Sequence, residues 1–125
     1  MPGLPAGSLG FARSSRIKLP GDFARAKAKG QRVVCGCIIA NVLARPEGAA
    51  SRLGVVTSKK IGNAVARSRA RRLLRESFRL HQPDLARAVD LVLVARPSIA
   101  GRKFADVEKD FLQVLRQARL EKGTT

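Results

Sequence analysis

Cationic side chains are concentrated in one segment of this chain, "SKKIGNAVARSRARRLLRESFR", which covers residues 58–79. Arginine presents a planar fork of donors that pairs bidentately with phosphate oxygens, and its plane stacks on exposed bases. Exposed helix faces usually mix the two signs of charge, whereas this segment has one acid, Glu76. The segment therefore predicts a surface that binds a polyanion. Its basic residues are Lys59, Lys60, Arg67, Arg69, Arg71, Arg72, Arg75 and Arg79.

Groups that could catalyse a reaction are sparse. A protein nuclease needs a general base or carboxylates that hold a metal ion. Asp106, Glu108 and Asp110 form one carboxylate cluster, but their place at the start of a helix favours interaction with the helix dipole over a metal site. His81 is the single histidine, and we interpret it as a side chain that stabilises a helix end. We therefore expect no catalytic residue and no metal site in the protein itself.

The overall charge agrees with a polyanionic partner. The chain has 125 residues, and its 25 Lys and Arg against 9 Asp and Glu leave a net charge of +16. RNA, DNA and an anionic membrane surface are the candidate partners. No apolar run reaches the roughly 18 residues that span a bilayer, so we expect no membrane role. Cys35 and Cys37 are too few for a disulfide scaffold, and we interpret them as reduced, buried residues of a cytoplasmic protein.

The elements before the basic segment are predicted from periodicity and breakers. Residues 20–29 favour a helix, which Gly30 ends in the left-handed conformation. Residues 32–44 favour one long strand or two short strands bent at Gly36. Turn residues follow, so we expect residues 52–58 to return antiparallel as the next strand.

The basic segment itself has helical periodicity from Ala64 to about Leu80, ending before Pro83. Its apolar stripe is expected to face the core and its arginines to face outward. Residues 89–95 favour a strand, and this strand-helix-strand order suggests a parallel pair. Residues 103–120 favour a second amphipathic helix. The apolar stripe of the basic helix comprises Ala66, Ala70, Leu73, Leu74 and Ser77, with Phe78 at its edge.

RNA is favoured over DNA as the partner. Arg67, Arg71 and Arg75 at i, i+4 spacing form a ridge with about 6 Å between neighbours, close to the phosphate spacing of an RNA strand. On the exposed side only Ser68 is available to read base edges in a DNA major groove. The A-form major groove is too narrow for such a helix, so we expect it to lie against the backbones of a folded RNA.

The stretch "SKKIGNAVARSRARRLLRESF" closely resembles the signature segment of the bacterial ribonuclease P protein subunit. The resemblance extends from about Arg16 to Leu120 through "RLGVVTSKK", "DLVLVAR" and the closing amphipathic helix. The residues that match the signature are Lys59, Lys60, Gly62, Asn63, Ala64, Val65, Arg67, Arg69, Arg72 and Arg75.

This resemblance implies a single α+β domain over residues 16–120. The implied fold has a four-stranded mixed sheet and three helices in the order α-β-β-β-α-β-α, similar to the second domain of a small-subunit ribosomal protein. It also implies a left-handed crossover through the basic helix, a departure from the usual right-handed rule. Residues 1–15 are expected to be a flexible basic tail and residues 121–125 a short C-terminal tail.

The implied function is assistance to a catalytic RNA that removes the 5′ leader of precursor tRNA. In that family the RNA and Mg²⁺ do the chemistry, so the implied partners are the RNA subunit and the leader, with no stable protein partner. The residues implied to contact the RNA subunit are Lys59, Lys60, Asn63, Arg67, Ser68, Arg69, Arg71, Arg72 and Arg75. Ser68 replaces the usual asparagine of the family and loses its second amide hydrogen.

The resemblance also implies a cleft for the single-stranded leader between the first helix and the sheet. Phe23, Lys27, Ile38 and Asn41 occupy the matching positions, where aromatic residues are common in the family. The chain has five Phe and no Tyr or Trp, so we expect leader binding to depend more on charge than on stacking.

Three alternative functions fit the sequence less well. A ribosomal structural protein would share the size and charge but has no reason to carry "KKIGNAVARSRARR". A DNA-binding module would need a helix packed before the basic one, where the sequence is strand-like. A self-sufficient nuclease lacks the carboxylates.

Overall fold

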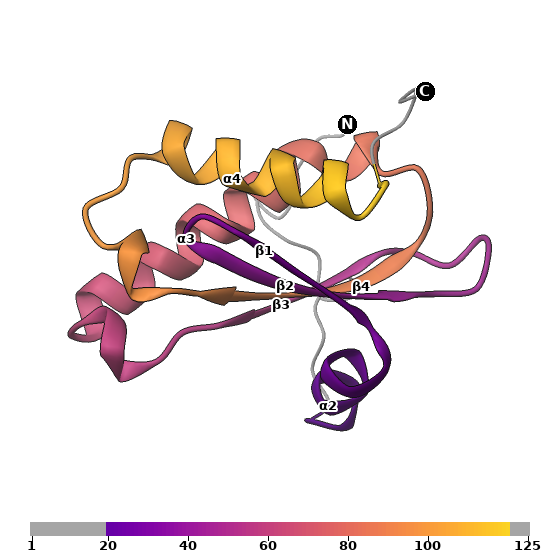
Figure 1. The fold of residues 1–125 in the computed structure, drawn as a ribbon, viewed down its shortest axis with the longest axis horizontal. Coiled ribbons are helices and arrows are strands. Elements are labelled where there is room, and N and C mark those ends of the chain that lie inside the picture. The colour runs from indigo at the N-terminus through magenta and orange to yellow at the C-terminus, as the bar shows by residue number, and fades with distance from the viewer. Residues whose placement is uncertain (1–19, 121–125) are drawn as a thin grey trace, which may run out of the picture.

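The structure, a computed structural model, describes residues 20–120 apart from the side chains of residues 20–23 and 27; the predicted tails over residues 1–15 and 121–125 lie outside the described part. A single sheet has α3 and α4 on one face and α2 on the other (Figure 1). The elements are α2 Pro20–Lys29, β1 Gln31–Cys35, β2 Ile38–Ala44, β3 Arg52–Val56, η2 Lys59–Ile61, α3 Ala64–His81, η3 Gln82–Asp84, β4 Val89–Ala95, η4 Pro97–Ile99 and α4 Phe104–Gln117. The predicted α+β class and the order α-β-β-β-α-β-α are confirmed, with short 3-10 helices (η) added.

The strand order is β1-β2-β4-β3. β3 and β4 pair in parallel, as the strand-helix-strand order predicted. The expectation that β3 would follow β2 as its antiparallel neighbour was wrong, because β4 lies between them and pairs antiparallel with β2. The loop after β2 therefore crosses the end of β4, and Arg45 N at its start donates to the Ala88 carbonyl at 2.9 Å.

β1 and β2 form a tight hairpin, so of the two predictions for this region the two-strand one is correct. Gly36 at the turn has φ +56, a value that glycine adopts at no steric cost. Cys37 lies in this turn rather than on a strand, and its backbone N–H donates to Asp110 Oδ2 at 3.0 Å. Both thiols are free and buried, as expected. Burial first, and then Asp110, raises the pKa of Cys37 to about 12.

The main core lies between the sheet and the pair α3–α4. The predicted core stripe of α3 is confirmed, since Ala70, Leu74 and Ser77 are buried there. Phe78 was expected at the edge of this stripe but is fully buried, because α4 packs on that side with Phe111. The hydroxyl of Ser77 donates to the Leu73 carbonyl at 3.0 Å, which satisfies it inside the core.

The other face of the sheet carries α2. Ala26 is fully buried against Val92. Gly30 ends the helix as predicted, but it is not among the residues with positive φ. A Cβ at this position would lie 2.4 Å from the Ala26 carbonyl oxygen and 2.7 Å from that of Val42. Gly30 is therefore required by the close approach of two backbones and not by a left-handed conformation.

None of the helices in residues 20–120 has the length and apolar character to cross a bilayer.

Candidate RNA-binding surface

A short connection, residues 58–63, leads from β3 into α3, and its residues make different structural contacts. Ser58 accepts the Lys60 N–H at 3.3 Å and caps η2. Ile61 is buried and anchors the connection to the core. Gly62 has φ +145, and Asn63 Oδ1 accepts the Ala66 N–H at 2.9 Å as the N-cap of α3. This arrangement leaves the side chains of Lys59 and Lys60 exposed beside the first turn of the helix.

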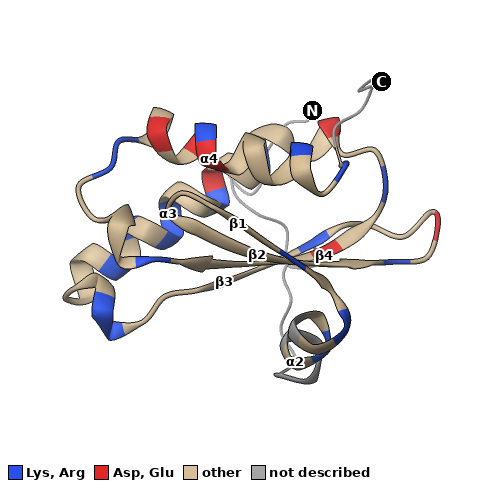
Figure 2. Cartoon of the chain, in the orientation of Figure 1, with Lys and Arg blue, Asp and Glu red and all other residues tan. Residues whose placement is uncertain are grey.

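Cations continue along the outward side of α3, as the periodicity predicted. Figure 2 shows Lys and Arg along this helix and on the loop that leads to α4. Within residues 20–120, none of the following six forms an ion pair with a carboxylate, whereas Arg79 pairs with Glu76. We call these six residues the basic surface: Lys59, Lys60, Arg67, Arg69, Arg71 and Arg72. Their positive charge is not neutralised within the described part of the fold, so the basic surface can bind an anionic partner.

Arg71 has a structural contact that the sequence did not indicate. It is half-buried, and its Nη1 donates to Thr57 Oγ1 at 2.8 Å. Its Nη2 donates to Ser68 Oγ at 3.1 Å. The guanidinium thus ties α3 to the end of β3 and fixes the hydroxyl of Ser68. Arg75, one turn further along, is exposed.

Arg69 connects the helix to a distant part of the chain. Its Nη2 donates to the backbone carbonyl of Arg102, in the loop between η4 and α4. Arg102 and Lys103 are both exposed in that loop. The positive surface therefore extends beyond α3, which the helical periodicity alone could not reveal.

The predicted leader cleft is only partly brought together. Asn41 lies on the α2 face of the sheet and is 5% exposed. Ile38 was assigned to the same cleft, and this was wrong: it is fully buried in the core on the α3–α4 face. Residues three apart on a strand point to opposite faces, so Ile39 is the neighbour that shares the face of Asn41. The side chains of Phe23 and Lys27 lie outside the described part.

A row of aliphatic side chains crosses the α2 face of the sheet. The strand register places Val34 beside Ile39, Ile39 beside Val94, and Val94 beside Val56. Val34 is 45% exposed and Val56 is 37% exposed. We call these four residues the apolar row. These four residues were not predicted from the sequence, although the two-residue alternation of a strand places Ile39 on the face of Asn41.

The carboxylates of α4 have separate structural contacts. Asp106 accepts the Lys103 N–H at 3.2 Å, as expected for an acid at a helix start. Asp110 holds the β1–β2 turn, and Glu108 Oε2 lies 2.7 Å from His81 Nε2. No group of three His, Cys, Asp or Glu side chains within residues 20–120 is arranged to hold a metal ion. The donor set in this range does not fit a protein-held Mg²⁺.

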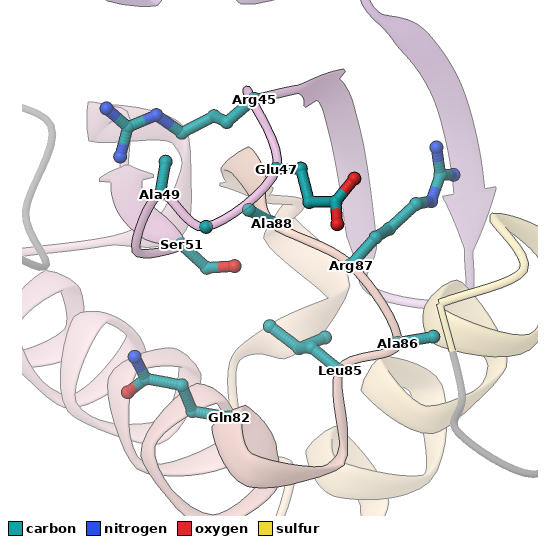
Figure 3. A pocket seen from close by; sticks show the side chains of 10 residues that line it. Arg45, Glu47, Ala49, Ser51, Gln82, Leu85, Ala86, Arg87 and Ala88 are labelled. Atoms are coloured by element: carbon teal, nitrogen blue, oxygen red, sulfur yellow. The ribbon is translucent and has the colours of Figure 1, made fainter.

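A depression of about 650 Å³ lies at the opposite end of the sheet from the start of α3. Figure 3 shows the side chains that line it. Its arginines are engaged with backbone carbonyls: Arg45 Nη1 donates to Ala50 and Arg87 Nη2 to Ala118. The Ser51 hydroxyl accepts the Val89 N–H at 3.1 Å. These polar groups serve the fold, so we place the functional site at the basic surface.

Comparison with known proteins identifies the family of the chain. The sequence model of the family Ribonuclease P matches residues 11–119. The chain is 36% identical over 107 residues to the ribonuclease P protein component of Gluconacetobacter diazotrophicus, covering 85% of this chain and 92% of that protein. It is 40% identical over 112 residues to that of Ruegeria pomeroyi, covering 86% and 89%.

A solved structure of a Staphylococcus aureus RNase P protein mutant superimposes with a TM-score of 0.80 at 30% identity, covering 86% of this chain and 91% of that chain. The sequence and the fold thus agree over most of the chain. The chain belongs to the ribonuclease P protein family, whose members are the protein subunit of the bacterial enzyme that processes the 5′ ends of tRNA.

Proposed function

We propose that the chain binds the catalytic RNA subunit of ribonuclease P through the basic surface, together with Asn63, Ser68 and Arg75. In the same proposal the RNA subunit and its Mg²⁺ ions cleave precursor tRNA, while the protein improves binding and positioning of the substrate. Because the proposed substrate is precursor tRNA, we place this activity in the cytoplasm. We propose no stable protein partner.

The observation that carries this proposal is the set of six cations on one side of η2 and α3 with no carboxylate partner in residues 20–120. Each contact to a phosphate releases condensed counterions, which makes binding strong and dependent on salt. The side chains rise from a regular helix and a capped turn, so their spacing is set before the RNA arrives and little ordering entropy is lost.

We further propose that the 5′ leader lies on the α2 face of the sheet, across the apolar row. Arg32 is exposed on β1 beside Asn41 and supplies a cation at this face. The row ends at Val56, three residues before Lys59, so the two RNA-binding surfaces meet at the end of β3. A leader placed there would lead directly to the basic surface.

The test is cleavage of a precursor tRNA by a bacterial ribonuclease P RNA at low Mg²⁺, with and without the protein. We expect correct 5′ maturation with the intact protein and at least tenfold less with Arg67→Ala/Arg69→Ala, because two phosphate contacts are lost. Lys109→Ala/Arg119→Ala is the control, since it removes the same charge from exposed positions outside the basic surface. Equal loss in both double variants, or no stimulation by the wild type, would refute the proposal.

A further inference from the structure

One apolar side chain stands out on the basic surface. Val65, in the first turn of α3, is 76% exposed, far more than Val34, Val56 or Leu80. Two cations, Arg69 and Arg72, lie on the same side of the helix. Methyl groups have neither charge nor hydrogen-bond donors to bind a phosphate. Phosphate binding alone therefore does not account for an aliphatic residue at this position.

Val65 belongs to a shallow cleft of about 430 Å³ formed with Ala64, Ser68, Arg69 and Arg72. The spacing of Val65, Arg69 and Arg72 places their side chains on one side of the helix. Arg69 is held in place through its hydrogen bond to the Arg102 carbonyl. The cleft is thus lined by an exposed aliphatic side chain and two arginines, one of which is held in place.

Ser68 adds a directed hydrogen-bond donor. Its oxygen accepts from Arg71 Nη2 at 3.1 Å, so the hydroxyl can donate its proton to a different acceptor. These features match the properties of a nucleobase. The aliphatic side chain suits its apolar face, the planar cations can stack on that face, and the single donor suits the acceptors on its edge.

We propose that this cleft receives one unstacked nucleobase of the catalytic RNA subunit, an inference that rests on the function proposed above. The surrounding cations complement the phosphates on either side of that base. The base belongs to the RNA subunit rather than to the leader, because α3 lies on the opposite face of the sheet from the apolar row.

The test is equilibrium binding to a ribonuclease P RNA at several salt concentrations. Val65→Ala removes two methyl groups that the base would cover, and we expect affinity to fall about tenfold. Arg72→Lys keeps the charge but removes the plane, and we expect a loss of about fivefold. In both variants the slope of log affinity against log salt is expected to stay unchanged, because no phosphate contact is lost. Leu80→Ala, on the same helix at an exposed position, is the control and is expected to bind as the wild type does.

Wild-type affinity for Val65→Ala, with Arg69→Ala still impaired, would overturn this inference and leave the proposed function standing. A loss of affinity confined to precursor tRNA, with binding of the RNA subunit unchanged, would overturn the assignment of the base to the RNA subunit. If the wild-type protein does not bind the RNA subunit, the proposed function fails first and this inference fails with it.

Discussion

The Nε2 atom of His81 lies 2.7 Å from Oε2 of Glu108, which joins the last residue of α3 to α4. On its other side, Nδ1 of the same ring lies 3.4 Å from Asp84 Oδ2. The ring centroid is 6.1 Å from that of Phe111 in the core. The histidine was predicted to stabilise the helix end, and its contacts join that end to a second helix.

Loss of this contact should lower stability. We expect Glu108→Ala to reduce the free energy of unfolding by about 1 kcal/mol, because a partly buried hydrogen-bonded pair is broken. Urea denaturation with Glu47→Ala as the control measures this, since Glu47 is an exposed acid in the loop after β2. Equal midpoints for the two variants would show that the contact contributes nothing.

Gly36→Ala should cost more than Gly48→Ala. Both residues have positive φ, so both substitutions introduce backbone strain of about 1 kcal/mol. At Gly36 the new Cβ would also lie 2.2 Å from the Asp110 carboxylate, whereas at Gly48 nothing lies within 4 Å. We expect a further loss of about 1 kcal/mol at Gly36, because Asp110 must leave the Cys37 N–H. Thermal unfolding of both variants gives the comparison, and equal losses would contradict the bracing role of Asp110.

Alkaline pH should destabilise the fold through Cys37. The pKa of this thiol is raised from 9.0 to about 12 in the folded chain, so the unfolded chain releases its proton first. The stability from this difference is fully present below pH 9.0 and is lost as pH rises toward 12, by at most about 1.4 kcal/mol per pH unit. Urea unfolding between pH 8 and about pH 11 should show a steeper decline for the wild type than for Cys37→Ala. Parallel declines would refute this.

Leader binding should be sensitive to salt. The apolar row offers aliphatic side chains and no aromatic plane, so we expect charge to supply much of the leader affinity. The advantage of a long leader over a short one should fall steeply as salt rises. Arg32→Ala should lower the salt slope by about 0.7, the value for one phosphate contact to a single strand. Lys109→Ala serves as the control. If the affinity advantage of the long leader does not change with salt concentration, the prediction is wrong.

Local patterns predicted the elements well but not their neighbours. The bounds of α2 and β4 follow from composition and breakers alone, because the determinants lie within the segments. The position of β4 between β2 and β3 depends on packing against α3 and α4, which no local signal encodes. The reason for Gly30 was also not predictable from local sequence, because it depends on the Val42 carbonyl, which is distant in sequence.

The same distinction holds for the site. The outward arc of α3 was predictable because helical periodicity alone decides it. Arg71 was predicted only as an RNA contact, since its bond to Thr57 depends on how α3 meets β3. Ile38 was placed on the wrong face because the resemblance was applied without the two-residue alternation of a strand. The contact of Arg69 with Arg102 spans 33 residues of sequence and was out of reach.

The central position of β4 has a consequence for synthesis of the chain. β4 ends at Ala95, so β3 has no sheet neighbour until that residue has left the ribosome, and α4 completes the core later still. Until then the apolar stripe of α3 lacks the α4 side chains that pack with it in the core. Because domains acquire their packing as whole units, the basic helix gains its fixed orientation only after α4 has been synthesised.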